Sequence, residues 1–322
     1  MTSPRSERIT VVSACFNEEA VLGRFVDAVA QALDGVPGLS YRLLLVDDGS
    51  RDRTAALIAE LRQTRPWLEG LVLTRNFGHQ TALSAGLEYA RGDAVILMDS
   101  DLQHPPELLP QFIARWREGF DVVAGVRLDT PGAGWFKRSS SRLFYLVFNL
   151  LSDVRITAGA ADFCLLSRRV RRSLAAMPER HRFLRGLVEW LGYPRCELRY
   201  TAQARAAGVS KYPLRRMLAF ACDAVLSFSV WPLRLTVRLG LAIAALGLGY
   251  LAYVVVLAFR QQTVSGWAST IACILILSGI QLTVLGVMSE YLARQTELLR
   301  SRPLFVLRAR QRGTWRQTGA AG

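Results

Sequence analysis

Two aspartates one residue apart follow an apolar run in the first third of the chain. They are Asp99 and Asp101, which come directly after residues 94–98 and shortly before Gln103. Alternate side chains at a strand end point the same way, and two like charges this close repel each other unless a cation lies between them. Hard oxygen ligands suit Mg²⁺ or Mn²⁺. We therefore expect a divalent ion to be held by Asp101, by Asp99 directly or through a water, and by the carbonyl oxygen of Gln103.

A second pair of carboxylates, Asp47 and Asp48, follows the apolar run 41–46 and precedes Gly49. The glycine and the polar residues after it are typical of a turn that leads into a capped helix. That interpretation does not explain two adjacent aspartates at a strand end, so we expect Asp48 to accept hydrogen bonds from a base or a ribose. The run 75–86, which begins Arg-Asn-Phe-Gly-His-Gln and ends on a small Ala-Gly pair, is predicted to serve packing.

Basic residues gather downstream of the acidic motifs and beside the apolar segments, and the net charge of the 322 residues is +14. Lipid headgroups are the expected partners of most of them, and some could form a cradle for a phosphomonoester because arginine donates bidentate hydrogen bonds. A nucleic-acid-binding protein would not need its arginines beside membrane-length apolar runs. We therefore predict membrane lipids and a phosphorylated lipid as partners, and no nucleic acid. The basic residues concerned are Arg127, Lys137, Arg138, Arg142, Arg205 and Lys211.

The scaffold for these groups is predicted by an alternation of apolar runs and amphipathic stretches. Short apolar runs separated by helices indicate an α/β fold with a mostly parallel sheet that is covered on both faces. Ligands of such sheets bind at the carboxyl ends of the strands, where the aspartates lie. The strands are expected at 9–14, 41–46, 71–74, 94–98 and 122–124, and the helices at 20–33, 52–65, 80–91 and 106–118.

Two long runs without a charged residue, 239–259 and 267–289, lie near the C-terminus. Each is long enough to cross about 30 Å of hydrocarbon as a helix. Arginines precede the first run and follow the second, which predicts an integral membrane protein with the large domain and both termini in the cytoplasm. Small residues four apart, such as Gly240 and Ala244, suit packing either between subunits of a homo-oligomer or against the second run.

The predicted organisation therefore has four parts. A cytoplasmic catalytic domain occupies residues 1–211 and an amphipathic segment follows at 212–232. The two transmembrane helices lie within 233–292, and a basic cytoplasmic tail covers 293–322. The amphipathic stretches 137–151 and 212–231 either lie in the membrane interface or pack on a core. The five cysteines are scattered without a CxxC pair, in keeping with a reducing compartment.

These motifs together resemble glycosyltransferase family 2, of GT-A fold, and its polyprenyl-phosphate glycosyltransferase branch, which includes dolichol-phosphate mannosyltransferases and bactoprenol glucosyltransferases. The resemblance runs from residue 9 to about residue 306. Of these motifs, only the Asp-x-Asp-Leu-Gln run is specific for the family when taken by itself, but all of them together are highly specific. The motifs are Asn17-Glu18-Glu19, Asp47-Asp48-Gly49-Ser50, Arg75-Asn76-Phe77-Gly78, the run from Asp99 to Glu107, Gly208-Val209-Ser210-Lys211-Tyr212 and the two-span hairpin.

The resemblance also implies a role for each group of site residues. The implied roles are nucleotide-sugar contacts from Asn17, Glu19, Asp48 and Asp99; metal ligation by Asp99, Asp101 and Gln103; contacts to the acceptor phosphate or the donor diphosphate from Arg127, Lys137, Ser141 and Arg205, with Lys211 nearby; and a catalytic set of Asp101, Asp99, Asp162 and Arg127. The sequence departs from the family pattern at Ala14, where proline is usual, at Cys164, where arginine is frequent, and at Ser289, where glycine is usual. None of these touches the metal site, but Cys164 puts the chemistry on the acceptor side in doubt.

The activity that the resemblance implies is inverting transfer of a sugar, with UDP-glucose as the first expected donor, to a polyprenyl phosphate at the cytoplasmic membrane face. Undecaprenyl phosphate is the expected lipid for a bacterial source. An anionic phosphate needs little or no general base, so Asp162 is expected to orient the sugar or a basic residue.

Three other functions would leave different marks in the sequence. A processive polysaccharide synthase would carry Gln-x-x-Arg-Trp well downstream, and a nicotinamide-dependent dehydrogenase would carry Gly-x-Gly-x-x-Gly after the first strand. Neither motif is present in the sequence. A non-catalytic membrane adaptor would keep the fold but would not need Asp99, Asp101 and Gln103.

Overall fold

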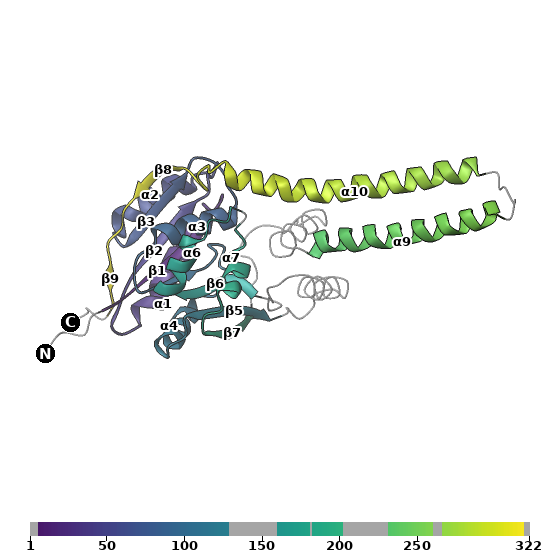
Figure 1. Cartoon of the computed structure of the whole chain (residues 1–322). Helices are drawn as coiled ribbons and strands as arrows, with labels where there is room; N and C mark the ends of the chain where they lie inside the picture. The colour runs from purple at the N-terminus through teal and green to yellow at the C-terminus, as the bar shows by residue number, and fades with distance from the viewer. Residues whose placement is uncertain (1–5, 129–159, 181, 202–230, 260–265, 319–322) are drawn as a thin grey trace. The chain divides into compact units, whose positions relative to one another are not determined.

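The computed structural model describes residues 6–128, 160–180, 182–201, 231–259 and 266–318 (Figure 1). The chain forms two compact units. The first contains the described strands and includes the segment from Pro303 to the C-terminus, and the second contains the two long helices. Each unit is described by itself below.

The elements of the first unit alternate between strand and helix over most of its length. In chain order they are β1 (Glu7–Cys15), α1 (Leu22–Asp34), β2 (Leu39–Asp47), α2 (Thr54–Thr64), β3 (Leu68–Leu73), α3 (His79–Tyr89), β4 (Ala94–Leu97), the 3₁₀ helix η1 (Pro106–Leu108), α4 (Leu109–Arg117), β5 (Val122–Leu128), β6 (Ala160–Ser167), α6 (Arg168–Ala176), α7 (Leu184–Leu191), β7 (Arg195–Thr201), β8 (Leu307–Gln311) and β9 (Arg316–Gln317). The second unit contains α9 (Trp231–Phe259) and α10 (Trp267–Leu299).

One mixed sheet contains all the strands of the described residues, in the order β7-β5-β6-β4-β1-β2-β3-β8, with β9 paired to β2. The β1 strand runs parallel to β2 and β4, and β2 runs parallel to β3. The five predicted strands and the four predicted helices are confirmed, with ends that shift by a few residues. The predicted α/β class with a mostly parallel sheet is therefore confirmed.

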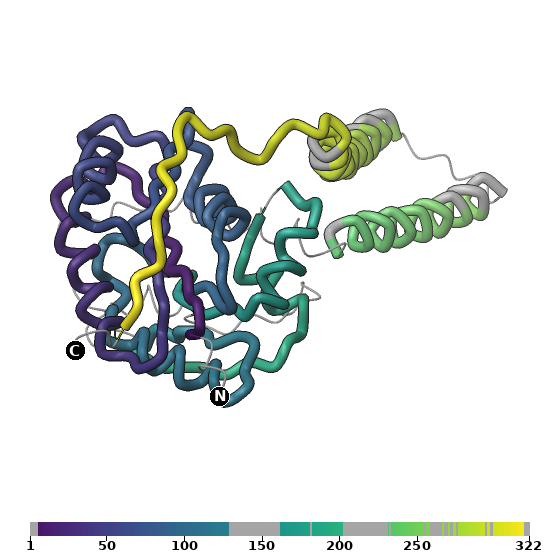
Figure 2. Tube along the Cα trace, turned by 90° about the vertical axis from the view of Figure 1, so that its left-hand side faces the viewer, coloured from purple at the N-terminus to yellow at the C-terminus, as the bar shows by residue number. Residues whose placement is uncertain are grey.

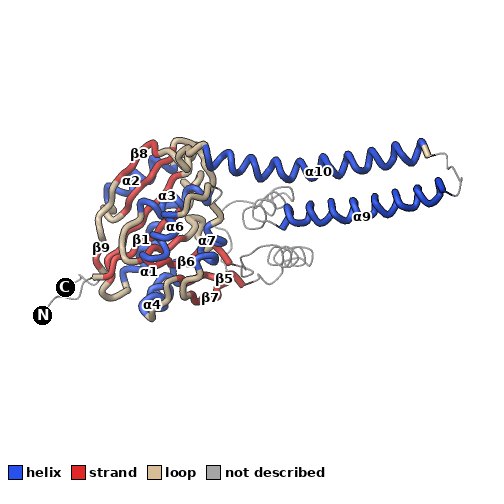
Figure 3. The backbone as a smooth tube through the Cα atoms, in the orientation of Figure 1, coloured by secondary structure: helices blue, strands red, loops and turns tan. Residues whose placement is uncertain are grey.

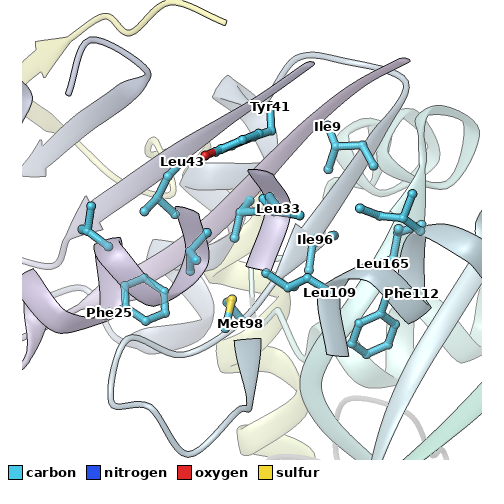
Figure 4. Packing of buried hydrophobic residues seen from close by; sticks show 14 of the residues in the cluster. Ile9, Phe25, Leu33, Tyr41, Leu43, Ile96, Met98, Leu109, Phe112 and Leu165 are labelled. Atoms are coloured by element: carbon cyan, nitrogen blue, oxygen red, sulfur yellow. The ribbon is translucent and has the colours of Figure 1, made fainter. Parts of the chain in front are cut away.

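Helices cover both faces of the sheet, as the continuous apolar strands predicted (Figure 3). On one face, side chains of α1, α2 and α4 pack against β1, β2 and β4 in a single buried cluster, part of which is drawn in Figure 4. Phe25 of α1 and Phe112 of α4 are fully buried there. On the other face α3 approaches β1 so closely that a Cβ added to Gly86 would lie 2.2 Å from Cγ1 of Val12. The prediction that this small residue serves packing is confirmed.

The antiparallel strand β6 was not predicted, and it changes the neighbours of the acidic strand β4. It lies between β4 and β5 and is antiparallel to both, whereas β7 pairs in parallel with β5 at the sheet edge. Because β6 runs in the opposite direction, its first residues lie at the carboxyl edge of β4. The predicted amphipathic stretch 137–151 lies outside the described residues, as does 212–231 except for its last residue.

The C-terminal segment returns to the first unit and completes its sheet. Sequence alone assigned residues 293–322 to a basic tail, but α10 continues to Leu299, β8 pairs antiparallel with β3, and β9 pairs with β2 (Figure 2). The arginines of this segment are partly used inside the protein. Arg310 donates to Glu69 Oε1 at 2.8 and 3.1 Å, and Arg42 donates to Glu69 Oε2 at 3.0 Å. Glu69 is 1% exposed, so it is a buried anion held between two cations.

Substitution of Glu69 is expected to loosen the C-terminal segment from the sheet. In Glu69→Ala, Arg42 stays buried without its anion and Arg310 loses the partner that anchors β8, so the free energy of unfolding should fall by about 3 kcal/mol. Thermal unfolding and the rate of limited proteolysis after residue 300 measure this effect. Arg312→Ala is the matched control, because the exposed side chain is removed while its carbonyl still accepts from Arg62. Equal stability of the two variants would contradict the anchoring role.

The second unit contains two helices that are long and apolar enough, by length and composition, to cross a membrane. The apolar windows run from Leu233 to Tyr250 in α9 and from Ile276 to Ala293 in α10. Both helices are longer than the uncharged runs 239–259 and 267–289, because α9 starts before the first run and α10 continues after the second.

Candidate active site at the carboxyl edge of the sheet

The turns that follow β1 and β2 hold each other through side chain to backbone hydrogen bonds. Ser50 Oγ accepts from the backbone N–H of Asn17 at 2.9 Å, and Asn17 Oδ1 accepts from the N–H of Arg51 at 2.9 Å. Glu19 Oε2 accepts from the N–H of Arg53 at 2.9 Å. Asn17 has a φ of +57°, a conformation that asparagine tolerates better than most residues. The contacts of Asn17 and Glu19 to a nucleotide stay predictions, but both residues shape the turn in which they were expected to act.

Asp48 is buried directly after β2 and organises the next turn. Its two carboxylate oxygens accept from the N–H groups of Phe77 and Gly78 at 2.7 and 2.9 Å. Burial raises the pKa of Asp48, and these two hydrogen bonds offset part of the rise. A carboxylate has about four acceptor directions, so Asp48 can still accept from a ligand. Gly49 is required here because its φ is +69° and a Cβ would lie 2.4 Å from the carbonyl carbon of Arg75.

The two aspartates after β4 sit in a tight turn. Asp101 Oδ1 accepts from the N–H of Gln103 at 3.0 Å, and Leu102 between them has a φ of +62°, which is unusual for a leucine. Asp99 Oδ1 is buried and accepts no regular hydrogen bond from the described residues. A buried carboxylate oxygen without a regular hydrogen bond, beside a second carboxylate, suits a hard divalent cation. Asp99 and Asp101 therefore fit the expected metal site, although the described residues contain no group of three His, Cys, Asp or Glu side chains arranged to hold an ion.

Two histidines flank Asp99, and sequence reasoning assigned neither of them. His104 Nδ1 accepts from the backbone N–H of Asp99 at 3.0 Å, so its proton is on Nε2, which lies 3.6 Å from Asp99 Oδ2. His79 Nε2 lies 3.2 Å from Asp99 Oδ1. Burial opposes the charge on Asp99, but the two neighbouring imidazoles lower its pKa to about 2. Burial also opposes the charge on His79, but the carboxylates of Asp99 and Asp162 outweigh it and raise the pKa of His79.

Asp162 lies at the start of β6, where the strand passes Asp99, and is 6% exposed. Its two oxygens accept from Arg185 Nε and NH2 at 2.8 and 2.9 Å, and Oδ2 also accepts from Gln80 at 2.7 Å. The side-chain oxygen Oε1 of Gln80 in turn accepts from the N–H of Leu184 at the start of α7. Although burial favours the neutral acid, Arg185 lowers the pKa of Asp162. Asp162 is thus an ionised side chain of β6 that is fixed by donors from two helices, α3 and α7.

The prediction that the run 75–86 serves packing is confirmed at Gly86 but leaves out the centre of the run. Gly86 packs on β1, but His79 and Gln80 at the start of α3 reach Asp99 and Asp162. The sequence feature that could have identified His79 and Gln80 is their position shortly after β3, at the same edge of the sheet as the aspartates. Arg185 lies in a region of the sequence with no clear periodicity, so no local pattern could identify it as a partner of Asp162.

The predicted phosphate-binding residues are only partly within the described part of the chain. Arg127 lies near the end of β5, where it is exposed, and is in register with Tyr200 of β7. The other predicted residues of this group lie outside the described residues and stay predictions; they are Lys137, Ser141, Arg205 and Lys211.

Comparison with known proteins places these features in a family. Residues 10–175 match the family described as Glycosyl transferase family 2, and residues 231–295 match the GtrB C-terminal hairpin. The chain is 36% identical over 304 residues to the uncharacterized glycosyltransferase YkcC of Bacillus subtilis, with 94% of each chain covered. It is 35% identical over 308 residues to the bactoprenol glucosyl transferase of Shigella phage SfII, with 95% of this chain and 99% of the relative covered.

Among solved structures, the mannosyl-3-phosphoglycerate synthase of Rubrobacter xylanophilus is similar with a TM-score of 0.48 and 20% identity. The similarity covers 68% of this chain and 72% of the synthase.

Proposed function

Because the chain belongs to glycosyl transferase family 2 and continues into a GtrB C-terminal hairpin, we propose that it transfers a sugar from a nucleotide-sugar to a polyprenyl phosphate. The family and the observed mixed sheet agree with the GT-A fold that the sequence resemblance implied. UDP-glucose is the favoured donor and undecaprenyl phosphate the favoured lipid. Relatives named bactoprenol glucosyl transferase, which match almost from end to end, support this choice.

One observation carries the proposal. Asp99 Oδ1 is buried and accepts no regular hydrogen bond from the described residues, although His79 Nε2 lies 3.2 Å away, and it lies at the edge of the sheet from which the turns after β1 and β2 also leave. We propose that Asp99 and Asp101, with the carbonyl oxygen of Gln103, hold Mg²⁺ or Mn²⁺. When bound, such an ion would supply positive charge to the departing nucleoside diphosphate. Asn17, Glu19 and Asp48 would contact the nucleotide from the neighbouring turns.

On the acceptor side of the reaction, the protein's role is to position the phosphate of the lipid. A phosphate monoester is anionic near neutral pH, so its oxygen can attack the anomeric carbon without a general base and invert the configuration. The bidentate pair with Arg185 keeps Asp162 ionised and fixes its direction. This contact supports the role of orienting a basic residue, and we assign Asp162 to positioning rather than to proton removal. Arg127, with the predicted basic residues downstream, would hold the phosphate in line.

The membrane arrangement is part of the same proposal. Residues before α9 and after α10 belong to one sheet, so a hairpin of two spans would leave both of them on the same side of the membrane. The arginines that flank the apolar runs favour the cytoplasmic side. Protease access to the C-terminal segment in sealed vesicles of known orientation tests this placement.

The activity is tested by incubating the purified full chain in detergent with Mg²⁺ or Mn²⁺, polyprenyl phosphate and a panel of radiolabelled nucleotide-sugars. We expect label from one donor, first UDP-glucose, to pass into the organic phase, and to stay in water when the lipid is omitted. Label in a water-soluble polymer would instead indicate a processive synthase. No transfer from any donor, with no nucleotide bound, would indicate an adaptor that keeps the fold.

A further inference from the structure

The side chain of Tyr200 is buried beside the site with its hydroxyl group unused. Tyr200 lies in β7 and is 5% exposed, and its Oη has no hydrogen-bond partner among the described residues. A buried donor without an acceptor is destabilising, and folded proteins rarely keep one unless something else binds it. The missing acceptor is therefore a clue to a ligand.

The ring of Tyr200 is held in place by the same aromatic cluster that supports the acidic turn. It meets the ring of Phe163 edge-on at 5.6 Å and 89°, and the ring of His104 at 6.0 Å and 84°. His104 is stacked on Phe163 and accepts from the backbone N–H of Asp99. A Cβ at Gly125 would lie 3.2 Å from Cε1 of Tyr200, so the tyrosine ring occupies the space that this glycine leaves.

The charges that act on the hydroxyl define the ligand that it would meet. Arg127, its register neighbour in β5, and Arg185 contribute positive charge, whereas Asp99 and Asp101 contribute negative charge. Burial raises the pKa of Tyr200 to about 12, so the phenol is a protonated donor near neutral pH. Arg127 also has only donors to offer. A ligand that satisfies both side chains must present acceptor oxygens, and an anionic phosphoryl oxygen does so most strongly.

We propose that the Tyr200 hydroxyl donates a hydrogen bond to a phosphoryl oxygen of a bound substrate, which makes it a further binding residue of this site. The inference rests on the proposed function, in which two phosphoryl groups meet at this edge of the sheet. One is the diphosphate of the nucleotide-sugar, and the other is the phosphate of the lipid. The chemistry is the same for both, and the experiment separates them.

The test is Tyr200→Phe, which keeps the ring and removes only the hydroxyl group. Binding of UDP and GDP in the presence of Mg²⁺, and separately of a short-chain polyprenyl phosphate, is measured by calorimetry on the full chain in detergent. We expect the affinity for one ligand class to fall on the order of tenfold or more, as for loss of a hydrogen bond to a charged group. The thermal midpoint should stay the same or rise, because an unpaired buried hydroxyl is removed. Weaker nucleotide binding assigns the contact to the diphosphate, and weaker lipid binding alone assigns it to the acceptor.

Tyr193→Phe is the matched control, since the Tyr193 hydroxyl already has Ser173 as a partner at 3.0 Å. This variant should show the opposite pattern, with a lower thermal midpoint and unchanged binding. If wild-type protein binds a nucleotide or the lipid phosphate, and Tyr200→Phe binds each of these ligands as tightly as wild type does, the inference is overturned while the proposed function stands. If wild-type protein binds neither class and transfers no sugar, the proposed function fails and this inference with it.

Discussion

Replacing Asp101 by asparagine is expected to reduce sugar transfer by about a thousandfold or more, with the protein still folded and membrane-bound. Asparagine keeps an oxygen that can accept from the N–H of Gln103, so the turn around Leu102 should persist. What the variant loses is the negative charge with which Asp101 and Asp99 would hold a divalent ion. A thousandfold loss corresponds to about 4 kcal/mol in the barrier, within the range for removal of an electrostatic group at a reaction centre.

The measurement is the initial rate of label transfer into the organic phase at saturating donor and lipid, with Asp101→Asn and wild-type protein compared at equal thermal stability. Glu107→Gln is the matched control, because it makes the same carboxylate-to-amide change at an exposed position six residues further on. Excess EDTA should remove wild-type activity, and added Mg²⁺ or Mn²⁺ should restore it. Near-full activity of Asp101→Asn would reject the metal site.

Replacing Arg185 by methionine is expected to destabilise the first unit by about 3 kcal/mol at neutral pH. The reason is that Asp162, which is 6% exposed, would keep its charge in a buried place with Gln80 as its remaining hydrogen-bond donor among the described residues. Because Arg185 holds the pKa of Asp162 below its usual value, the ion pair stabilises the protein above about pH 4. This contribution is lost as the pH falls through the lowered pKa, so wild type and variant should converge in strong acid.

Thermal unfolding across pH checks the size and the sign of this effect. Arg172→Met on the surface of α6 is the control, since Arg172 is exposed and should tolerate the change. The double variant Arg185→Met with Asp162→Asn should recover part of the stability, because position 162 no longer carries a buried charge. It should not recover sugar transfer. A double variant as active as wild type would show that the pair serves the fold alone.

The local sequence was sufficient for the parallel half of the sheet. The runs that became β1, β2 and β4 are rich in apolar residues and almost wholly buried, and the aspartates at their ends lie at the edge where ligands of such sheets bind. The acidic pair Asp99 and Asp101 was predicted for the same reason. The two long apolar helices were predicted by length and composition, and comparison with the GtrB hairpin supports them.

The groups that surround the aspartates followed from no local pattern. Arg185 and Gln80 meet at Asp162 only because β6 runs antiparallel between β4 and β5, which places residues about a hundred positions apart within hydrogen-bond distance. Tyr200 stands in an edge strand whose residues are mostly polar, and β8 is rich in arginine, so neither strand has the apolar alternation from which strands are predicted. Periodicity reports which face of an element is buried, but the order of strands in a sheet is a long-range choice that depends on the packing of the whole domain. For that reason the aspartates at the edge of the sheet could be predicted one by one from the sequence, whereas their partners depended on the assembled sheet.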